Sequence, residues 1–434
     1  MHILSLDVGT SAVKAAVIDC DSARPVAPPV RIRYEIDHPT QDAAEIPPER
    51  LRSAVWQAAG TAVAAAPHFT VAGVGFSCLM PALVLLDSHN RPLSPIWIHL
   101  DRRSRAKARL IQAECGEEFL NTCGNRPLPG GMSALCYLQQ IEDNPSLRNL
   151  TKHYLHANGW LAWLLTGTYH MDPANASFTG LWNTLTDQRW SYRWCERFDV
   201  DPQWLPEVVC GSTTVGGLLP HVAQEWNVPA GIPVKIGTAD TSSGMLAARM
   251  LPGDQFITIG TTTVLTRFVN RPKPDPRRLT RRFGVGPSYI YAAHNPVGGA
   301  ALKWLHQLCY RDQTSDEFHK QTIPRVARRN TEVLLDPPFL GGDRLEIESR
   351  RAAFRELTLA TDRDDLLAAT LTTMRDGHLA AFAALDWETP PTGKFFLTGG
   401  ALDTLKIILP ELANADIQTI EEGALHGVAR LFTP

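Results

Sequence analysis

Asp240 is a lone carboxylate at the end of an apolar run in this 434-residue chain. It follows the run that opens VKIGTADTSSGML (234–246), and its close neighbours are Gly, Thr, Ala and Ser. No Lys or Arg occurs from 236 to 248, so no cation close in the sequence pairs with this carboxylate. One interpretation is that Asp240 caps a helix beginning at Thr241. A helix N-terminus at this point would also favour phosphate.

A turn near the N-terminus has the composition of a phosphate-binding site. In LDVGTSAVK (6–14), small and hydroxyl-bearing residues separate apolar runs at 3–8 and 12–18, which predicts a β-hairpin. Backbone N–H groups and hydroxyls of such a turn can bond phosphate oxygens, Lys14 adds a positive charge, and Asp7 can hold a water molecule or Mg²⁺. The alternative is an ordinary hairpin with a glycine turn. The predicted turn residues are Gly9, Thr10 and Ser11.

The same design recurs in the second half of the chain. In DQFITIGTTTVLTRFVN (254–270), an apolar strand, a Gly-Thr-Thr turn and a second apolar strand follow one another. Two such hairpins could clamp phosphates from both sides, although two hairpins can also resemble each other by chance. Neither a GxxxxGK[ST] loop nor a GxGxxG fingerprint occurs in the chain. The turn of the second hairpin consists of Gly260, Thr261 and Thr262.

A third glycine-rich stretch, FLTGGALDT (396–404), could receive a flat ring. A strand that runs into Gly399-Gly400 lets a group such as adenine approach the backbone closely, and Thr404 ends the stretch. The alternative is a common Gly-Gly turn between a strand and a helix.

The elements that would position these residues form two α/β halves, each opening with a Gly-Thr hairpin. The first half continues with a helix at 48–65, strands at 70–77 and 82–93, and a mostly helical, tryptophan-rich region at 105–210. The basic stretch DPRRLTRRFG (275–284) is expected to be a solvated surface loop. The remaining predicted elements of the second half lie at 295–308, 363–385, 394–409 and 421–431.

Composition indicates an ordinary globular protein. Hydrophobic residues make up 44% of the chain and charged residues 20%, and the net charge is −3. Without a long Lys/Arg run, the sequence offers no footprint for nucleic acid or an anionic membrane. The 8 cysteines contain no CxxC pair, which favours reduced thiols over a disulfide framework or a zinc site. With no signal-peptide core and no long apolar run, a cytoplasmic location is expected.

Taken in order, these motifs resemble the FGGY carbohydrate kinase family, which includes glycerol kinase, xylulokinase and gluconokinase. LDVGTSAVKAAVID resembles the family's first phosphate motif, ITIGTTTVL its second and LTGGALDT its adenosine motif, and the stretches 163–183 and 205–240 resemble its middle region. The resemblance implies two ribonuclease H-like domains, as in actin and hexokinase, with sugar and ATP in the cleft between them. We expect an N-terminal domain at 1–245 and a C-terminal domain at 246–434.

The resemblance also assigns roles on the nucleotide side. Asp240 matches the family's catalytic base, and together with Asp7 it is expected to hold Mg²⁺. In GGAALKW (298–304), Gly299 would allow close approach to the adenine, and Lys303 occupies a position that often carries a nucleotide contact. An exposed helix lysine is the alternative for Lys303.

On the sugar side the sequence departs from the family pattern. Met80 and Pro81, in CLMPA, stand where relatives carry a polar sugar-binding pair, and His99 replaces a usual tryptophan. Met80, His99 and Asp101 are the expected substrate contacts, with a surface pair between Asp101 and Arg103 as the alternative. We expect a small neutral sugar, with the five-carbon ketose D-xylulose first. Gluconate ranks lower, because no arginine is evident for its carboxylate.

The resemblance therefore implies an ATP-dependent, Mg²⁺-requiring kinase acting on a small sugar or polyol, and it admits a homodimer. Two other classes of protein stay open at this point. One is an actin-like or chaperone-type ATPase, which the long match through 163–240 disfavours. The other is a sugar-binding regulator derived from a kinase, which the retained Asp7, Thr10, Thr261 and Asp240 disfavour.

Overall fold

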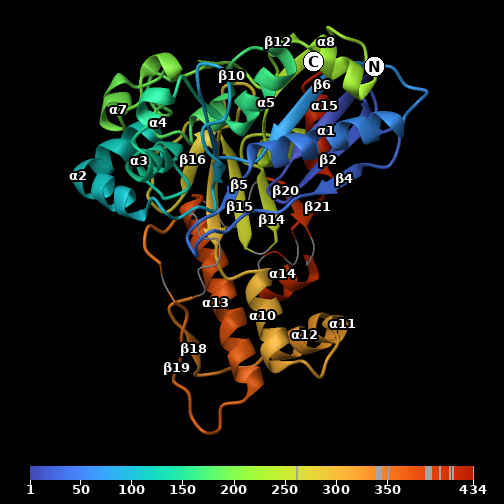
Figure 1. Ribbon diagram of the computed structural model, residues 1–434. Helices are drawn as coiled ribbons and strands as arrows, with labels where there is room; N and C mark the ends of the chain where they lie inside the picture. The colour runs from blue at the N-terminus through green and yellow to red at the C-terminus, as the bar shows by residue number, and fades with distance from the viewer. Residues whose placement is uncertain are drawn as a thin grey trace.

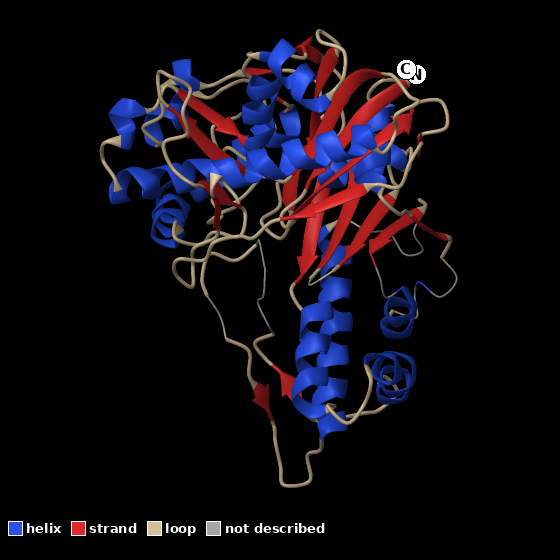
Figure 2. Cartoon of the chain, turned by 45° about the vertical axis from the view of Figure 1, so that its right-hand side comes forward, coloured by secondary structure: helices blue, strands red, loops and turns tan. Residues whose placement is uncertain are grey.

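Two β-sheets, each opening with an antiparallel hairpin, form the centre of the molecule (Figure 1). The computed structural model describes residues 1–260, 262–338, 345–349, 351–386, 393–399, 402–409, 412 and 415–433. Both termini lie together at one end of the molecule (Figure 2). Within the described ranges, no helix combines the length and the apolar character needed to cross a membrane.

The first sheet is built around the predicted N-terminal hairpin. β1 (His2–Val8) pairs antiparallel with β2 (Ala12–Asp19) and parallel with β6 (Val71–Cys78), and β6 pairs parallel with β13 (Pro233–Ala239). Because side chains alternate along a strand, Leu4 packs on one face of the sheet and Ile3 on the other. The outer strands of this sheet are β12 (Thr214–Gly217), β3 (Arg24–Pro25) and β4 (Val30–Arg33).

Helices cover both faces of this sheet. The face that carries Leu4 packs against α1 (Pro48–Ala64), α5 (Ala157–Thr166) and α8 (Pro220–Trp226). The opposite face packs against the last helix, α15 (Gly423–Arg430), so the end of the chain returns to the first sheet. Ser5 Oγ of β1 donates a hydrogen bond of 2.9 Å to the carbonyl of Leu425 in α15. This return places the start of α15 beside the N-terminal hairpin.

The second sheet repeats the arrangement of the first. β14 (Gln255–Ile259) pairs antiparallel with β15 (Thr263–Val269) and parallel with β20 (Phe395–Gly399). Helices α13 (Arg363–Ala384) and α14 (Leu402–Ile408) pack on one face. On the other face, Phe256 packs against Met245 of α9 (Asp240–Ala247). The remaining strands are β17 (Tyr289–Asn295), β16 (Leu279–Arg282) and β21 (Ile417–Thr419).

Two further groups of elements surround the sheets. The helices α2 (Arg105–Cys123), α3 (Ser133–Asp143), α4 (Leu147–Leu150) and α7 (Tyr192–Arg197) lie on the left of Figure 1. A small sheet consists, in order, of β5 (Glu45–Ile46), β8 (Ile96–Ile98), β7 (Ala82–Leu86) and β9 (His153–His156). At the bottom, α13 continues beyond the sheet beside α10 (Gly299–Cys309), α11 (Ser315–Glu317) and α12 (Ile323–Val326). The other short elements are α6 (Pro173–Ala176), β10 (His170–Met171), β11 (Glu207–Val208), β18 (Leu334–Leu335) and β19 (Phe354–Arg355).

Most of the predicted elements are present, including both hairpins and the helix at 48–65. The strand predicted at 82–93 ends at Leu86, because the Asp87 carboxylate accepts backbone hydrogen bonds from His89 and Arg91 and forms a turn. The region 105–210 also contains the short strands β9, β10 and β11.

The expectation of a solvated loop at 275–284 is wrong. Leu279–Arg282 is the edge strand β16, and all its residues are buried. The arginines are accommodated because their guanidinium groups stack on tyrosine rings and bond carbonyl oxygens: Arg278 lies 3.6 Å from the ring of Tyr291, and Arg282 donates to the carbonyls of Gly286 and Pro287.

Candidate active site

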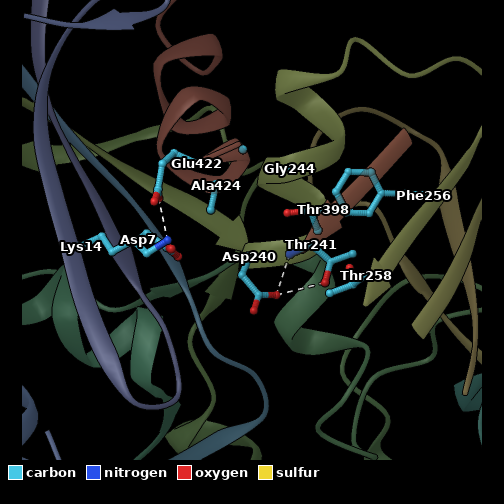
Figure 3. Close-up of a pocket in the computed structure, with 11 residues that line it drawn as sticks. Asp7, Lys14, Asp240, Thr241, Gly244, Phe256, Thr258, Thr398, Glu422 and Ala424 are labelled. Carbon is cyan, nitrogen blue, oxygen red and sulfur yellow. Dashed lines mark hydrogen bonds and ion pairs between the residues drawn. The ribbon is translucent and has the colours of Figure 1, made fainter. Parts of the chain in front are cut away.

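The first cavity of interest lies between the two hairpins and has a volume of about 170 Å³. It brings together Asp7, Lys14 and Asp240, which the sequence had singled out from two separate stretches. In Figure 3, Asp7, Lys14 and Glu422 lie on one side of Asp240, and Thr258 lies on the other. The lining residues are Asp7, Lys14, Asp240, Thr241, Gly244, Phe256, Thr258, Thr398, Glu422, Gly423 and Ala424.

Asp240 sits where β13 ends and α9 begins, with an exposed side chain. Its Oδ1 accepts hydrogen bonds from the backbone N–H of Thr241 at 2.6 Å and from Thr241 Oγ1 at 3.1 Å. The bend that presents it depends on Gly237, which has φ +68°, because a Cβ there would lie 1.6 Å from the carbonyl oxygen of Phe76. Asp240 is therefore both part of a helix start and an accessible carboxylate.

Asp7 lies on β1 beside the first turn. Ser77 Oγ of the neighbouring strand donates to Asp7 Oδ1 at 2.8 Å. Burial, and next the charge of Asp240, raise the pKa of Asp7 from 3.8 to about 6, against the opposing effect of the Ser77 hydrogen bond. A cation between the two carboxylates would relieve this repulsion, so the pair fits a divalent metal ion with oxygen ligands.

Lys14 is engaged by a partner that the sequence analysis did not consider. Its Nζ lies 2.6 Å from Oε2 of Glu422, immediately before α15, and both side chains are partly exposed. This ion pair joins the first hairpin to the end of the chain (Figure 3). The only sequence signal was the acidic pair Glu421-Glu422 ahead of a helical stretch.

Both glycine turns are tied to neighbouring segments. In the first, Gly9 N–H donates to Ala12 at 3.0 Å, and Thr10 and Ser11 lie at the surface end of the hairpin. In the second, Gly260 N–H donates to the carbonyl of Thr262 at 3.0 Å, and the Gly260 carbonyl accepts from Gly299 N–H at 3.2 Å. Thr261 and Gly400 lie outside the described residues.

A second cavity, of about 180 Å³, lies on the other side of Asp240 and contains the expected sugar contacts Met80 and His99. Asp240, Thr241 and Thr258 line both cavities, so the carboxylate stands on their common wall. The full lining is Leu79, Met80, His99, Phe178, Asp240, Thr241, Thr258, Val264, Thr266, Leu279, Arg281, Ala292 and His294.

This second cavity changes two expectations about the sugar side. Arg281 lines it, so the premise that no arginine is available there was wrong; its Nη1 donates to Ser242 Oγ at 2.6 Å. Asp101 does not line it. The Asp101 carboxylate is fully buried and bonded to the Ala44 N–H at 3.0 Å and to Arg103 Nη2 at 2.7 Å. The pair with Arg103 exists, but inside the protein rather than at its surface.

A third, mostly apolar cavity lies against the second hairpin and contains Gly299 and Thr404. Gly399, the last residue of β20, is not among the described lining residues. It has φ +100°, and a Cβ there would lie 2.1 Å from the carbonyl oxygen of Ile259. Lys303 has an exposed side chain on α10 and lines none of these three cavities. The described lining consists of Ile259, Thr263, Gly299, Leu302, His319, Met374, His378, Thr404, Leu405 and Ile408.

A family model for the N-terminal domain of the FGGY family of carbohydrate kinases matches residues 2–247. The chain belongs to this family. It is therefore a carbohydrate kinase, an enzyme that transfers a phosphoryl group to a sugar hydroxyl, and this result disfavours the ATPase and regulator alternatives.

The relatives of this kinase include proteins named for two different substrates, xylulose and gluconate. The chain is 25% identical to the xylulose kinase of Staphylococcus xylosus over 377 residues, 85% of this chain and 77% of that one. It is 23% identical to the gluconokinase of Bacillus subtilis over 420 residues, 92% of this chain and 80% of that one.

The fold of the kinase is shared with solved structures over nearly the whole chain. The xylulose kinase of Lactobacillus acidophilus superposes with a TM-score of 0.87 at 18% identity, covering 99% of this chain and 88% of that one. The chain therefore has the α/β fold of these kinases, which consists of two ribonuclease H-like domains.

Proposed function

We propose that this kinase transfers the γ-phosphoryl group of ATP to a hydroxyl of a small sugar bound in the second cavity, with Asp240 as the general base. The observation that carries the proposal is the place of Asp240 on the wall shared by the first and second cavities. A carboxylate there reaches a sugar hydroxyl from one side and a phosphate from the other. By accepting the hydroxyl proton as the new P–O bond forms, such a base contributes ~10²–10⁴ in rate.

The first cavity is suited to the phosphates. The backbone of the turns at 9–11 and 260–262 would donate to phosphate oxygens, and Lys14 would exchange its bond with Glu422 for one with a phosphate. Asp7 and Asp240 would hold Mg²⁺, which supplies charge neutralisation to the transferring group when bound. The third cavity, with its mostly apolar walls and Gly299 in its lining, would receive the adenine ring.

D-xylulose is the first candidate substrate, because Met80 makes the second cavity less polar beside β6 and a five-carbon ketose needs no charged partner. Gluconate, or another sugar acid, is the second candidate. Arg281 in the cavity wall favours it, since a guanidinium group can pair with a carboxylate.

The domain boundary proposed at residues 245–246 falls inside α9. On this division α15 belongs to the C-terminal domain by sequence and packs on the first sheet. Closure of the cleft would therefore take place around a junction that contains both helices.

An ADP-release assay across ketopentoses, aldonates and polyols tests the proposal. Release that depends on one of these sugars supports the kinase, and the preferred sugar decides between the two candidates. Sugar-independent release would indicate an ATPase. Sugar binding by calorimetry without release in any reaction would indicate a regulator. The Asp240→Asn variant serves as the control, because it should remove the sugar-dependent release alone.

A further inference from the structure

Glu422 is an acidic residue in the wall of the first cavity that takes no part in the proposed transfer. It directly precedes α15, and Gly423 and Ala424 of that helix line the cavity with it. An acid in the wall of a phosphate site is unfavourable, because like charges repel. The other two carboxylates in the lining, Asp7 and Asp240, are proposed to have Mg²⁺ as their counter-ion. The presence of Glu422 therefore needs another explanation.

The Glu422 carboxylate is bonded to the cation of this cavity. Lys14 is the one Lys or Arg among the described lining residues, and its Nζ lies 2.6 Å from Glu422 Oε2 (Figure 3). The cation best suited to a phosphate oxygen is thus already paired with an anion that the protein itself supplies.

The backbone holds Glu422 in an unusual conformation. Its φ is +46°, in the left-handed region that few residues other than glycine adopt. Within the described residues, its carboxylate makes no capping hydrogen bond to α15, which is the usual use of a polar side chain at the start of a helix. Backbone strain of this kind is found chiefly at functional sites. Helix capping does not account for Glu422, whereas the pair with Lys14 does.

This ion pair is placed so that it can open. The side chains of Lys14 and Glu422 are 26% and 37% exposed, so solvent reaches both partners. A pair with this exposure contributes little to the stability of the fold. A phosphate oxygen can take the place of the carboxylate by a charge-assisted hydrogen bond to the same ammonium group. Opening the pair costs the protein little, but that cost is subtracted from the free energy of nucleotide binding.

We propose that Glu422 is a competing counter-ion that tunes the nucleotide affinity of the kinase. It occupies Lys14 until the phosphates of a nucleotide displace it, and it returns to Lys14 when the nucleotide leaves. This inference rests on the proposed function in one respect, the placement of the phosphates in the first cavity. Competition for Lys14 weakens the binding of ADP as well as that of ATP, so it eases release of the product. Glu422 acts through Lys14 and touches neither substrate.

Calorimetric binding of ADP with Mg²⁺ tests the proposal without sugar and without turnover. Glu422→Gln keeps the length of the side chain and removes its charge, so that Lys14 is left to the phosphates. We expect Kd for ADP to fall by about three- to fivefold, which corresponds to the loss of one exposed ion pair. An unchanged Kd would overturn the proposal. A higher Kd would also overturn it, because Glu422 would then position Lys14 for phosphate instead of competing for it.

Glu421→Gln is the matched control. Glu421 is the neighbouring acid, and its exposed side chain lies outside the described lining of the first cavity. The substitution changes the charge of the protein by the same amount and should leave Kd for ADP nearly unchanged, because exposed charges farther away are screened by salt. An equal gain in affinity from both substitutions would mean that overall charge determines the affinity, which would overturn the role of the pair.

A double-mutant cycle separates competition from direct repulsion. Lys14→Met should raise Kd for ADP. Adding Glu422→Gln to Lys14→Met should then change Kd by less than about twofold, because no cation remains for which Glu422 can compete. A gain as large as in the native background would show that Glu422 repels the phosphates directly and would overturn the proposal. Melting curves confirm that each variant is folded, and Lys14→Gln takes the place of Lys14→Met if the latter is not.

Failure of this inference and failure of the proposed function give different results. A protein whose ADP affinity responds to Glu422→Gln as expected but which phosphorylates no sugar supports the competition and refutes the transfer. A sugar kinase whose ADP affinity is unaffected by Glu422→Gln keeps its function and refutes the competition. A native protein that does not bind ADP would overturn both.

Discussion

At the scale of single residues, Asp240 is the group on which the proposed chemistry depends. The Asp240→Asn variant keeps the shape of the side chain and the hydrogen bond to the Thr241 N–H but cannot take a proton. We expect kcat to fall by at least ~100-fold, with KM for ATP and sugar within a few-fold of the native values. Steady-state kinetics measure both, and a near-native kcat would refute the assignment.

The ionised Asp7 carboxylate, which is proposed to bind the metal ion, should lower the stability of the fold when no metal is bound. Its pKa of about 6 lies above the ordinary 3.8, so the fold disfavours the ionised form; stability is present at low pH and is lost as pH rises through about 6. Asp7→Asn should therefore raise Tm by roughly 1–3 °C at pH 8 in the absence of nucleotide and metal, and the difference should shrink at pH 5. Differential scanning fluorimetry at the two pH values measures this.

Asp19→Asn provides the control for Asp7. A hydrogen bond from Ser22 lowers the pKa of Asp19, the opposite direction, so its replacement should not raise Tm at pH 8. A Tm of Asp7→Asn at or below the native value at pH 8 would contradict the electrostatic account of Asp7.

At the scale of elements, the second hairpin is expected to serve the nucleotide alone. A Cβ on Gly260 would meet only the Thr262 carbonyl oxygen, at 3.9 Å, so a larger side chain fits the protein and would occupy the space proposed for phosphate. Gly260→Val should raise KM for ATP by about tenfold or more, because displacing the phosphate would cost about one hydrogen bond to a charged group. KM for sugar should stay nearly unchanged. Substrate kinetics and a melting curve check this.

Gly399→Ala is the contrasting variant in the adjacent strand. There a Cβ would lie 2.1 Å from the Ile259 carbonyl oxygen, and the residue has φ +100°. We expect a lower Tm and equal loss of activity toward both substrates. If Gly260→Val behaved in the same way, its effect would be a folding defect rather than a blocked phosphate site.

At the scale of the whole molecule, hydrogen bonds join the edge of the second sheet to the first half of the chain. Asn125 pairs with both the N–H and the carbonyl of Thr280 on β16, at 2.9 and 2.8 Å, and Ser177 Oγ accepts from Arg282 N–H at 3.1 Å. These bonds satisfy the free edge of the second sheet with side chains from the first half of the chain. They hold this side together, so closure is expected to take place elsewhere along the cleft.

Closure is needed because water must be kept from the phosphoryl group. Small-angle scattering should show a smaller radius of gyration with sugar and a non-hydrolysable ATP analogue together than with either ligand alone. Unchanged dimensions in the ternary complex would contradict a closing cleft.

Features that depend on neighbouring residues could be predicted from the sequence. Apolar runs separated by glycine and hydroxyl residues predict both hairpins. An apolar run followed by small residues predicts that Asp240 stands at the end of a strand. The family resemblance then placed Met80 and His99 in a common sugar site, and the structure brings them into one cavity with Asp240. Turn chemistry and strand alternation act over a few residues, which is why the sequence alone determined them.

The tertiary structure alone decided which distant side chains meet. Lys14 and Glu422 are separated by 408 positions and come together because α15 returns to the first sheet. Arg281 lines the second cavity, against the prediction of a surface loop, because it lies on the edge strand β16, where its guanidinium group donates to Ser242 Oγ and to the carbonyl of Arg282. Asp101, predicted as a substrate contact, is instead bonded to Arg103 within the protein. Such meetings depend on strand order and helix packing across the whole chain, and no local pattern encodes them.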